Sequence, residues 1–318
     1  LDKVYLDYMS KALIFPGQGS QVVGMGKDLF DEYESARSVF LEVDEALKKE
    51  LSKIIFYGPE RDLLLTENAQ PALMAMSVAV VRALESNGLK IQDYEFVAGH
   101  SLGEYTALTA ANAIKLSDAA ITLQKRGELM QKAVPIGRGA MAAIIGLDMS
   151  NVNSILNNFS EGVCEIANHN SPDQIVISGY KNDVERVAEE ARKSGAKRCV
   201  ILPVSAPFHC SLMKPAAEEM KNVLDKIVIN SPQIPLISNV SALPVRDAKE
   251  IKSLLVQQIT SMVRWNDIMT FMIEKKIQSL LELGSGRVLS GLAKRVSRNF
   301  IIHSVQSVAD IETIIKEI

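Results

Sequence analysis

Short apolar runs alternate with longer amphipathic stretches in the first part of the chain. Residues 11–15 and 95–99 are short and apolar, which is typical of buried strands. Three longer stretches have apolar residues at helical spacing and predict helices over residues 67–88, 104–114 and 117–134, the last opened by Ser117 as N-cap. Because strand and helix alternate, the pattern predicts the α/β fold class, with a mostly parallel sheet and helices on both faces.

The same alternation returns toward the end of the chain. It predicts strands over residues 235–240, 279–284 and 300–305, and helices near residues 211–226, 247–259, 265–275 and 287–296. We therefore expect residues 1–134 and 206–318 to form one large domain.

Residues 135–205 follow a different order. The order is strand, helix, strand, strand, helix, strand, with elements expected at residues 141–147, 150–160, 164–170, 174–180, 181–195 and 198–204. The polar residues 168–173 predict the hairpin turn between the two central strands. This order is that of the ferredoxin-like arrangement, so we expect a small subdomain inserted at residues 135–205.

Composition narrows the class of protein. The 318 residues are 47% hydrophobic and include 35 basic and 38 acidic residues, which leaves a net charge of −3. This balance excludes a disordered chain and disfavours nucleic-acid binding, which needs a basic surface. No apolar run approaches the about 18 residues of a membrane span, so no membrane association is expected.

The cysteines and the first residues bear on location. Cys164, Cys199 and Cys210 form no C-x-x-C pair, which disfavours zinc and redox motifs and favours a reducing compartment. Residues 1–8 are partly acidic and lack a long apolar run, so no signal peptide is expected, and Met9 is the expected natural start. The lack of an Arg-rich leader favours a cytoplasmic protein.

The sharpest motif is G-H-S-L-G at residues 99–103, between a predicted strand and a predicted helix. A serine in this pattern occupies a tight strand-to-helix turn, where its hydroxyl is exposed and the glycines relieve crowding. A backbone N–H at the start of the helix can face a developing oxyanion. This context favours Ser101 as a nucleophile over an ordinary loop residue.

A serine nucleophile needs a base, and the chain has four histidines. His100 is the neighbour of Ser101, and His169 lies in the predicted hairpin turn. His303 lies within an apolar strand, where a buried structural histidine is the usual case. His209 follows a predicted strand, at the edge where open α/β sheets keep their sites, so it is the leading candidate. The alternatives are His303 as the base and a purely structural role for His209.

Two glycine-rich segments follow other predicted strands. At residues 15–21 the glycines allow a ligand to approach the backbone, and Gln18 offers an amide donor, although a plain turn is the simpler interpretation. Residues 284–291 invite a dinucleotide site. Their spacing is G-x-G-x-x-x-x-G and no acidic residue follows at the expected distance, so this interpretation is disfavoured.

Taken together and in order, six segments resemble the malonyl-CoA:acyl-carrier-protein transacylase family of type II fatty acid synthesis. They are FPGQGSQ (15–21), GHSLGEY (99–105), QKRGELM (124–130), NSPDQIVISG (170–179), PFH (207–209) and GSGRVLSGL (284–292). The resemblance covers nearly the whole chain after about residue 11. It implies an α/β-hydrolase-like core with an inserted ferredoxin-like subdomain, in agreement with the hydrophobic pattern.

The resemblance also implies roles for particular residues. Ser101 would be the acylated nucleophile and His209 its base. The imidazole would be oriented by a backbone carbonyl, at the position of Gln258, instead of by a carboxylate. The backbone N–H groups of Gln18 and Leu102 would form the oxyanion hole.

The same resemblance assigns the substrate carboxylate to Arg126, on a helix that otherwise suggests a solvent-exposed face. A guanidinium binds a carboxylate bidentately, and an acetyl group would leave that charge unpaired. The implied reaction is ping-pong: malonyl-CoA acylates Ser101, CoA leaves, and the phosphopantetheine thiol of acyl carrier protein accepts the malonyl group. No metal or other cofactor is implied, and we expect a monomer.

Two other functions stay open at this point. A serine esterase or thioesterase would use the same turn, but Arg126 and the lack of an evident acidic triad partner favour transfer over hydrolysis. A scaffold without chemistry would share the fold, but intact Ser101 and His209 argue against it. Because acyl carrier proteins are typically acidic, docking would need a basic patch, for which the candidates are Arg287, Lys294, Arg295, Arg298, Lys193, Lys197 and Arg198.

Overall fold

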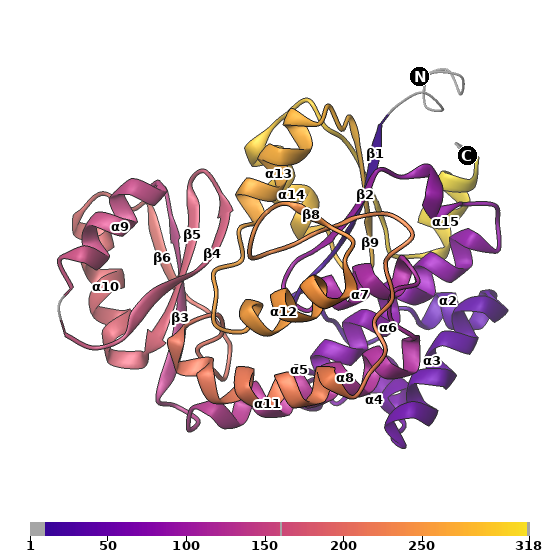
Figure 1. Ribbon diagram of the computed structural model, residues 1–318, viewed down its shortest axis with the longest axis horizontal. Coiled ribbons are helices and arrows are strands. Elements are labelled where there is room, and N and C mark those ends of the chain that lie inside the picture. The colour runs from indigo at the N-terminus through magenta and orange to yellow at the C-terminus, as the bar shows by residue number, and fades with distance from the viewer. Residues whose placement is uncertain (1–9, 160, 317–318) are drawn as a thin grey trace.

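Two sheets of different size organise the molecule (Figure 1). The computed structural model describes residues 10–159 and 161–316, so the expectation that Met9 is the natural start lies outside the described residues. The larger sheet has the strand order β10-β9-β1-β2-β7-β8, and all neighbours are parallel except β7 and β8. The strands are β1 (Lys11–Phe15), β2 (Phe96–Gly99), β7 (Leu236–Ile237), β8 (Pro244–Val245), β9 (Ser279–Leu283) and β10 (Ile301–Val305).

The central strand β1 is buried on both faces, which explains its unbroken apolar run. Leu13 and Phe15 belong to the core on one face, and Ala12 and Ile14 to the core on the other. The helices that contribute to the first core include α3 (Glu34–Leu47), α6 (Thr66–Glu85), α7 (Gly103–Ala110), α8 (Leu116–Ala133), α11 (Lys214–Asp225), α12 (Ala248–Gln258) and α15 (Val308–Ile315). Helices α13 (Trp265–Glu274) and α14 (Val288–Val296) cover the second face.

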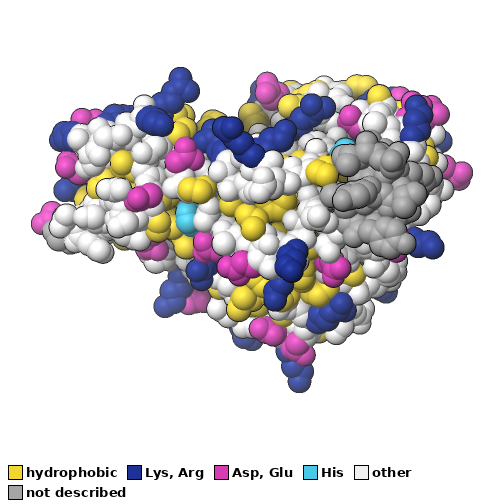
Figure 2. Space-filling view, turned by 90° about the horizontal axis from the view of Figure 1, so that it is seen from above, with side chains coloured by type: hydrophobic (Ala, Val, Ile, Leu, Met, Phe, Trp, Pro, Cys, Tyr) yellow, Lys and Arg dark blue, Asp and Glu magenta, His cyan; other side chains and the backbone are white. Residues whose placement is uncertain are grey.

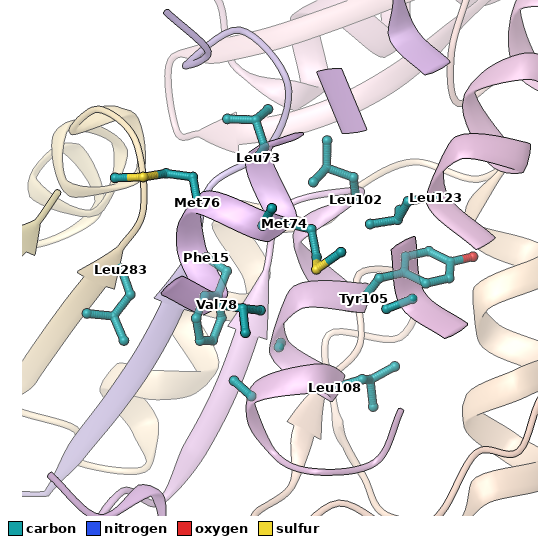
Figure 3. Packing of buried hydrophobic residues seen from close by; sticks show 14 of the residues in the cluster. Phe15, Leu73, Met74, Met76, Val78, Leu102, Tyr105, Leu108, Leu123 and Leu283 are labelled. Atoms are coloured by element: carbon teal, nitrogen blue, oxygen red, sulfur yellow. The ribbon is translucent and has the colours of Figure 1, made fainter. Parts of the chain in front are cut away.

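Helix α6 lies inside the first helical layer. Nearly all of its residues are buried, as expected for a helix that is apolar on every side. Figure 3 shows its Val78 beside Phe15, with Leu283 of β9 nearby, and its Met74 directed toward Tyr105 of α7. This packing also buries the polar residues on the first turns of α6, so they face other protein groups instead of water.

The smaller sheet is antiparallel, with the strand order β4-β5-β3-β6, and forms a separate layer at the left of Figure 1. Its elements are β3 (Gly139–Ile145), α9 (Met149–Asn157), β4 (Cys164–Ser171), β5 (Gln174–Tyr180), α10 (Lys181–Lys193) and β6 (Arg198–Ile201). Alternate residues of β3 face opposite sides, as the period of a strand requires. Ala142 and Ile144 pack with α9 and α10, whereas Met141 and Ala143 join the core of the larger sheet.

The structure is thus a mixed α/β fold with a parallel-rich sheet and a separate antiparallel sheet, which agrees with the predicted class and with the predicted order of strands and helices along residues 135–205. Some predicted boundaries are wrong. Helix α8 begins at Leu116, and Lys115, in an extended conformation, takes the N-cap position that was predicted for Ser117. Strand β4 continues to Ser171, so the turn to β5 is narrower than residues 168–173 suggest. Helix α7 ends at Ala110, earlier than predicted.

The largest omission of the sequence pattern lies between β1 and α6. The structure has four helices there, which are α2 (Lys27–Glu32), α3, α4 (Leu51–Tyr57) and α5 (Glu60–Leu64). Three of them have seven residues or fewer, too short for a helical period to stand out. Within residues 10–159 and 161–316, no helix is both long and apolar enough to cross a bilayer.

Candidate functional site

Ser101 lies on a tight turn between β2 and α7. Its backbone φ is 55°, in the left-handed region that non-glycine residues seldom adopt. A Cβ on Gly99 would come within 1.9 Å of the Gly103 backbone, and one on Gly103 within 2.5 Å of the Phe15 carbonyl oxygen, so only glycine fits. Asn239, which follows β7, holds the turn by accepting the Ser101 N–H at 2.7 Å and donating to the Gly99 carbonyl at 2.7 Å.

Ser101 and His209 lie together although 108 positions separate them. The distance from Ser101 Oγ to His209 Nε2 is 2.8 Å, and that from His209 Nδ1 to the backbone carbonyl oxygen of Gln258 is 2.8 Å. Because a carbonyl only accepts, Nδ1 carries the proton and Nε2 is left to accept from the serine hydroxyl. The pair therefore has the arrangement of a nucleophile and its base.

His209 is kept neutral by its surroundings. Burial and, second, the nearby Arg126 charge lower the pKa of His209 to about 3. Only the neutral imidazole can accept a proton, so the lowered pKa leaves His209 able to accept one at physiological pH. The φ of His209 is 59°, so both members of the pair have strained backbone, which is common at functional sites.

Arg126 of α8 is buried, with 1% of its surface exposed, so the solvent-exposed face suggested by the pattern is wrong at this residue. Its Nη2 is 3.2 Å from Ser101 Oγ and 2.8 Å from Gln258 Oε1, and its Nη1 donates to Gln70 Oε1 at 2.7 Å. Burial lowers the pKa of Arg126 from its ordinary value, but an arginine remains charged in proteins. A buried positive charge beside the serine attracts an anionic group.

The burial of Arg126 follows from how α6 and α8 pack. The helices meet at Gly127, where a Cβ would lie 2.5 Å from the Cα of Glu67. This close approach brings Arg126 against the first turns of α6, where Thr66 and Gln70 are buried. The adjacent glycine in QKRGELM therefore permits the contact that removes the arginine from solvent.

A buried carboxyl, that of Glu104, contacts the residues that hold the Ser–His pair. Glu104 of α7 accepts the Asn239 N–H at 2.5 Å and a proton of Gln258 Nε2 at 2.5 Å. The same Nε2 donates to the Ser101 carbonyl at 2.9 Å. Burial raises the pKa of Glu104 to about 8. Glu104 thus positions Asn239 and Gln258, the two residues that hold the serine turn and the histidine.

The residues 15–21 lie beside the serine turn. A Cβ on Gly17 would be 2.7 Å from the His100 carbonyl oxygen, so the two backbones are in contact. The backbone N–H groups of Gln18 and Leu102 have no backbone acceptor within the described residues. Two unpaired N–H donors on adjoining turns are suited to binding an oxyanion.

The other three histidines are engaged elsewhere. The ring of His100 is 2.9 Å from Asn170 Oδ1, which links the serine turn to β4. His169 Nδ1 is 3.6 Å from the Asp267 carboxylate. His303 lies on β10, at the edge of the larger sheet, and is half-buried instead of being the core residue that its apolar neighbours suggested. The geometry favours the fourth histidine as the base.

The glycine-rich residues 284–291 offer no room for a dinucleotide phosphate. Glu282 of β9 accepts the Leu289 N–H at 3.0 Å and the Ser290 N–H at 2.8 Å, and so caps α14 from inside. A phosphate at this helix start would have to displace a buried carboxylate. Within residues 10–159 and 161–316, no group of three or more His, Cys, Asp or Glu is arranged to hold a metal ion.

Sequence reasoning missed four polar residues that the structure places in or beside the site. Thr66, Gln70, Glu104 and Asn239 are all buried, each with at most 1% of its surface exposed. For Gln70, Glu104 and Asn239 the signal in the sequence is a polar residue inside a predicted helix or strand, which usually has a partner when it is buried. Thr66 precedes the predicted helix and gives no such signal. That signal predicts burial, but not which groups meet.

Known proteins match this chain along nearly its whole length. The sequence model of the acyl transferase domain family matches residues 12–308. The chain is 46% identical over 309 residues to the malonyl CoA-acyl carrier protein transacylase of Bacillus subtilis (strain 168), covering 96% of each. It is 42% identical over 286 residues to the protein of that name from Escherichia coli (strain K12), covering 90% of this chain and 92% of that protein.

Solved structures of similar proteins also superpose on nearly the whole chain. An acyl-carrier-protein-S-malonyltransferase from Bartonella henselae superposes with a TM-score of 0.95 at 50% identity, covering 97% of this chain and 99% of that one. A malonyl-transacylase solved in complex with its type II PKS acyl-carrier protein superposes with a TM-score of 0.94 at 40% identity, covering 97% and 100%.

Proposed function

The chain belongs to the acyl transferase domain family, and from this premise we propose that it moves the malonyl group from malonyl-CoA to the phosphopantetheine thiol of acyl carrier protein. The enzyme is an acyltransferase, like its relatives that are named malonyl CoA-acyl carrier protein transacylase. The observation that carries the choice of acyl group is the buried Arg126 guanidinium, 3.2 Å from the hydroxyl of Ser101. A carboxylate on the acyl group would pair with this charge, and an acetyl group would not.

In the first half-reaction, His209 Nε2 takes the hydroxyl proton as Ser101 Oγ attacks the thioester carbonyl of malonyl-CoA. The carbonyl oxygen becomes an oxyanion, which the N–H groups of Gln18 and Leu102 stabilise. The intermediate collapses with cleavage of the C–S bond, and the imidazolium returns the proton to the CoA thiolate. The Gln258 carbonyl keeps Nδ1 protonated and so holds the imidazole in one tautomer throughout.

In the second half-reaction, the phosphopantetheine thiol of the carrier takes the place of CoA. Neutral His209 accepts the thiol proton, and the thiolate attacks the malonyl-serine ester. The tetrahedral intermediate then expels the Ser101 alkoxide, which recovers the proton from the imidazolium. Serine, imidazole and guanidinium supply the nucleophile, the base and the anion-binding group, so we propose that the enzyme works without a resident cofactor.

We also propose a finer description of the architecture. The strand order of the smaller sheet, with two helices on one face, fits a ferredoxin-like subdomain at residues 135–205. The larger sheet, with the serine turn after β2, fits an α/β-hydrolase-like core built from residues 1–134 and 206–318. The contact of Asn170 with His100 supports a role of the subdomain in covering the serine turn.

Carrier docking is proposed at a basic part of the surface. Figure 2 shows Lys and Arg side chains gathered across the middle of the face seen from above. Of the candidate residues, Arg287 and Lys294 line one hollow of about 370 Å³ beside α14. Arg295 instead forms an ion pair with Asp173 at 3.5 Å. We therefore favour Arg287 and Lys294 over Arg295 for contact with an acidic carrier protein.

We further propose that the protein acts as a monomer in the cytoplasm. The three cysteines are free thiols, which suits a reducing compartment.

The test is self-acylation by an acyl-CoA, followed by mass spectrometry of the intact protein. Wild-type protein incubated with malonyl-CoA should gain one malonyl group, while acetyl-CoA under the same conditions should label it far less. Ser101→Ala should gain nothing, because the nucleophile is lost. As a control, Ser86→Ala, which changes an exposed serine at the end of α6, should label like wild type.

Two results would contradict the proposal. Absence of a malonyl adduct, or equal labelling by acetyl-CoA, would remove its basis. Rapid release of free malonate without a thiol acceptor would favour the thioesterase alternative, because a transferase must hold the acyl-enzyme until a thiol arrives.

A further inference from the structure

Within the described residues, the buried Arg126 guanidinium donates hydrogen bonds only to neutral acceptors and lies 5.8 Å from the centroid of the Tyr105 ring. Nη1 donates to Gln70 Oε1 at 2.7 Å, and Nη2 to Gln258 Oε1 at 2.8 Å and Ser101 Oγ at 3.2 Å. Nε has no acceptor. A buried charge normally has a charged partner, because its removal from water is costly. This guanidinium is therefore prepared for an anion that arrives from outside.

A buried acid lies close by but is held away from the guanidinium. Glu104 accepts from the Asn239 N–H and from Gln258 Nε2, each at 2.5 Å. The Gln258 amide therefore stands between the guanidinium and the carboxyl, with its oxygen toward Arg126 and its nitrogen toward Glu104. The Gln258 amide thus keeps the Glu104 carboxyl from forming an ion pair with Arg126.

Gln70 is the second amide on the guanidinium, and its orientation is forced. Because an arginine only donates, Gln70 must turn its carbonyl oxygen to Arg126. Its Nε2 then donates to Thr66 Oγ1 at 3.0 Å, and the Thr66 hydroxyl donates to Gln18 Oε1 at 3.1 Å. All three hydrogen bonds run in one direction, from the guanidinium to the residues 15–21. The amide is thereby locked as a neutral acceptor.

We propose that Gln70 is a specificity-determining positioning residue, which holds Arg126 in place with a neutral carbonyl and so leaves the positive charge for the carboxylate of the acyl group. This inference rests on the proposed malonyl transfer and deepens it. A glutamate has the same shape as glutamine but carries a charge. At position 70 it would neutralise Arg126 internally and repel a second carboxylate, whereas an uncharged acyl group would meet no such repulsion.

The experiment compares acyl groups in the Gln70→Glu variant of the full chain. Initial rates of acyl-enzyme formation are measured with malonyl-CoA and with acetyl-CoA, each over a range of concentrations. We expect the ratio of malonyl to acetyl kcat/KM to fall on the order of 100-fold, because the malonyl carboxylate would be brought against a like charge. The acetyl rate should fall far less than the malonyl rate.

Gln257→Glu is the matched control. Gln257 is an exposed residue of α12, where it donates to Ser253, so the change adds the same unit of charge outside the site. It should leave the malonyl-to-acetyl ratio unchanged. A ratio that falls equally in both variants would mean that net charge, and not the contact with Arg126, is responsible, and the inference would be overturned.

A second variant keeps the inference testable if Gln70→Glu does not fold. Gln70→Met removes the acceptor without adding charge, so KM for malonyl-CoA should rise several-fold while the acetyl-CoA kinetics change less. Equal losses for both acyl groups, or none, would show a merely structural residue. Failure of the proposed function looks different, because wild-type protein would then show no preference for malonyl-CoA at all.

Discussion

Two glycine-rich strand-to-helix turns of this protein, after β2 and after β9, begin at the same level of the larger sheet. They differ in whether their backbone N–H groups are paired. Strands β2 and β9 lie on either side of β1, and each leads through glycines into a helix. Ala98 of β2 and Glu282 of β9 both stand opposite Ile14 of β1. After β2, Ser101 occupies the turn and the Leu102 N–H has no backbone acceptor within the described residues.

After β9, the buried Glu282 carboxylate takes the first N–H groups of the helix for itself. The difference teaches that a glycine-rich strand-to-helix turn is a site only where the fold leaves its donors unpaired. After β2 the N–H groups of Gly103 and Glu104 donate to the His100 and Ser101 carbonyls, which leaves the Leu102 N–H open. After β9 an acid at the same level as Ala98 accepts the helix N–H groups instead.

The largest effect is expected from the histidine that serves the open turn. His209→Ala should slow acylation of Ser101 by malonyl-CoA about 10³-fold or more, because the hydroxyl loses its base. His303→Ala, beside the closed turn, should acylate at the wild-type rate. The rate of acyl-enzyme formation in both variants is measured by quenched-flow sampling followed by mass spectrometry of the intact protein. Equal loss in the two would mean that the Ser–His distance of 2.8 Å does not report catalysis.

A smaller effect, on stability alone, is expected at the closed turn. Glu282→Gln replaces one accepting oxygen by a donor that faces N–H groups, which should lower the free energy of unfolding by about 2 kcal/mol. Urea unfolding measures the change, and Ser290→Ala, which removes one of the hydrogen bonds to Glu282, should lose about half as much. The rate of acylation in the folded variants should stay near that of wild type. Unchanged stability in Glu282→Gln would contradict the capping role.

The smallest effect is an expected constancy with pH. The pKa of His209 is lowered to about 3, so the base stays neutral well below pH 6, and kcat/KM for acylation should change less than about twofold from pH 7 to pH 5, a range that lies below the pKa of Glu104, about 8. An imidazole of ordinary pKa near 6.5 would lose about 25-fold in its neutral form over this range. Initial rates measured at constant ionic strength distinguish a His209 pKa near 3 from one near 6.5. A fall of kcat/KM centred near pH 6.5 would refute the buried, neutral base.

The elements of the fold were largely predictable because their burial pattern is local. The apolar runs of β1, β3 and β5 are visible in the chain itself. The short helices between β1 and α6 were not predicted, since each is set by packing on α6 and not by its own period.

The site was predictable only in part. Ser101 could be located because its turn needs glycines at fixed offsets, which a sequence records directly. Pattern alone left His209 beside other candidates, and resemblance singled out Arg126 for a carboxylate without predicting its burial. Gln70 and Glu104 went unnoticed, because a polar residue in an apolar helix shows that a partner exists but not which one.

The sequence by itself determined the α/β class and the glycine turn that carries Ser101, because these depend on neighbours along the chain. The tertiary structure alone decided which residues meet. It brought His209 to Ser101, buried Arg126 among neutral amides, and closed the second glycine turn with Glu282. The physical reason is that unpaired charge and unpaired N–H groups are properties of surroundings assembled from distant segments, and no stretch of sequence contains them.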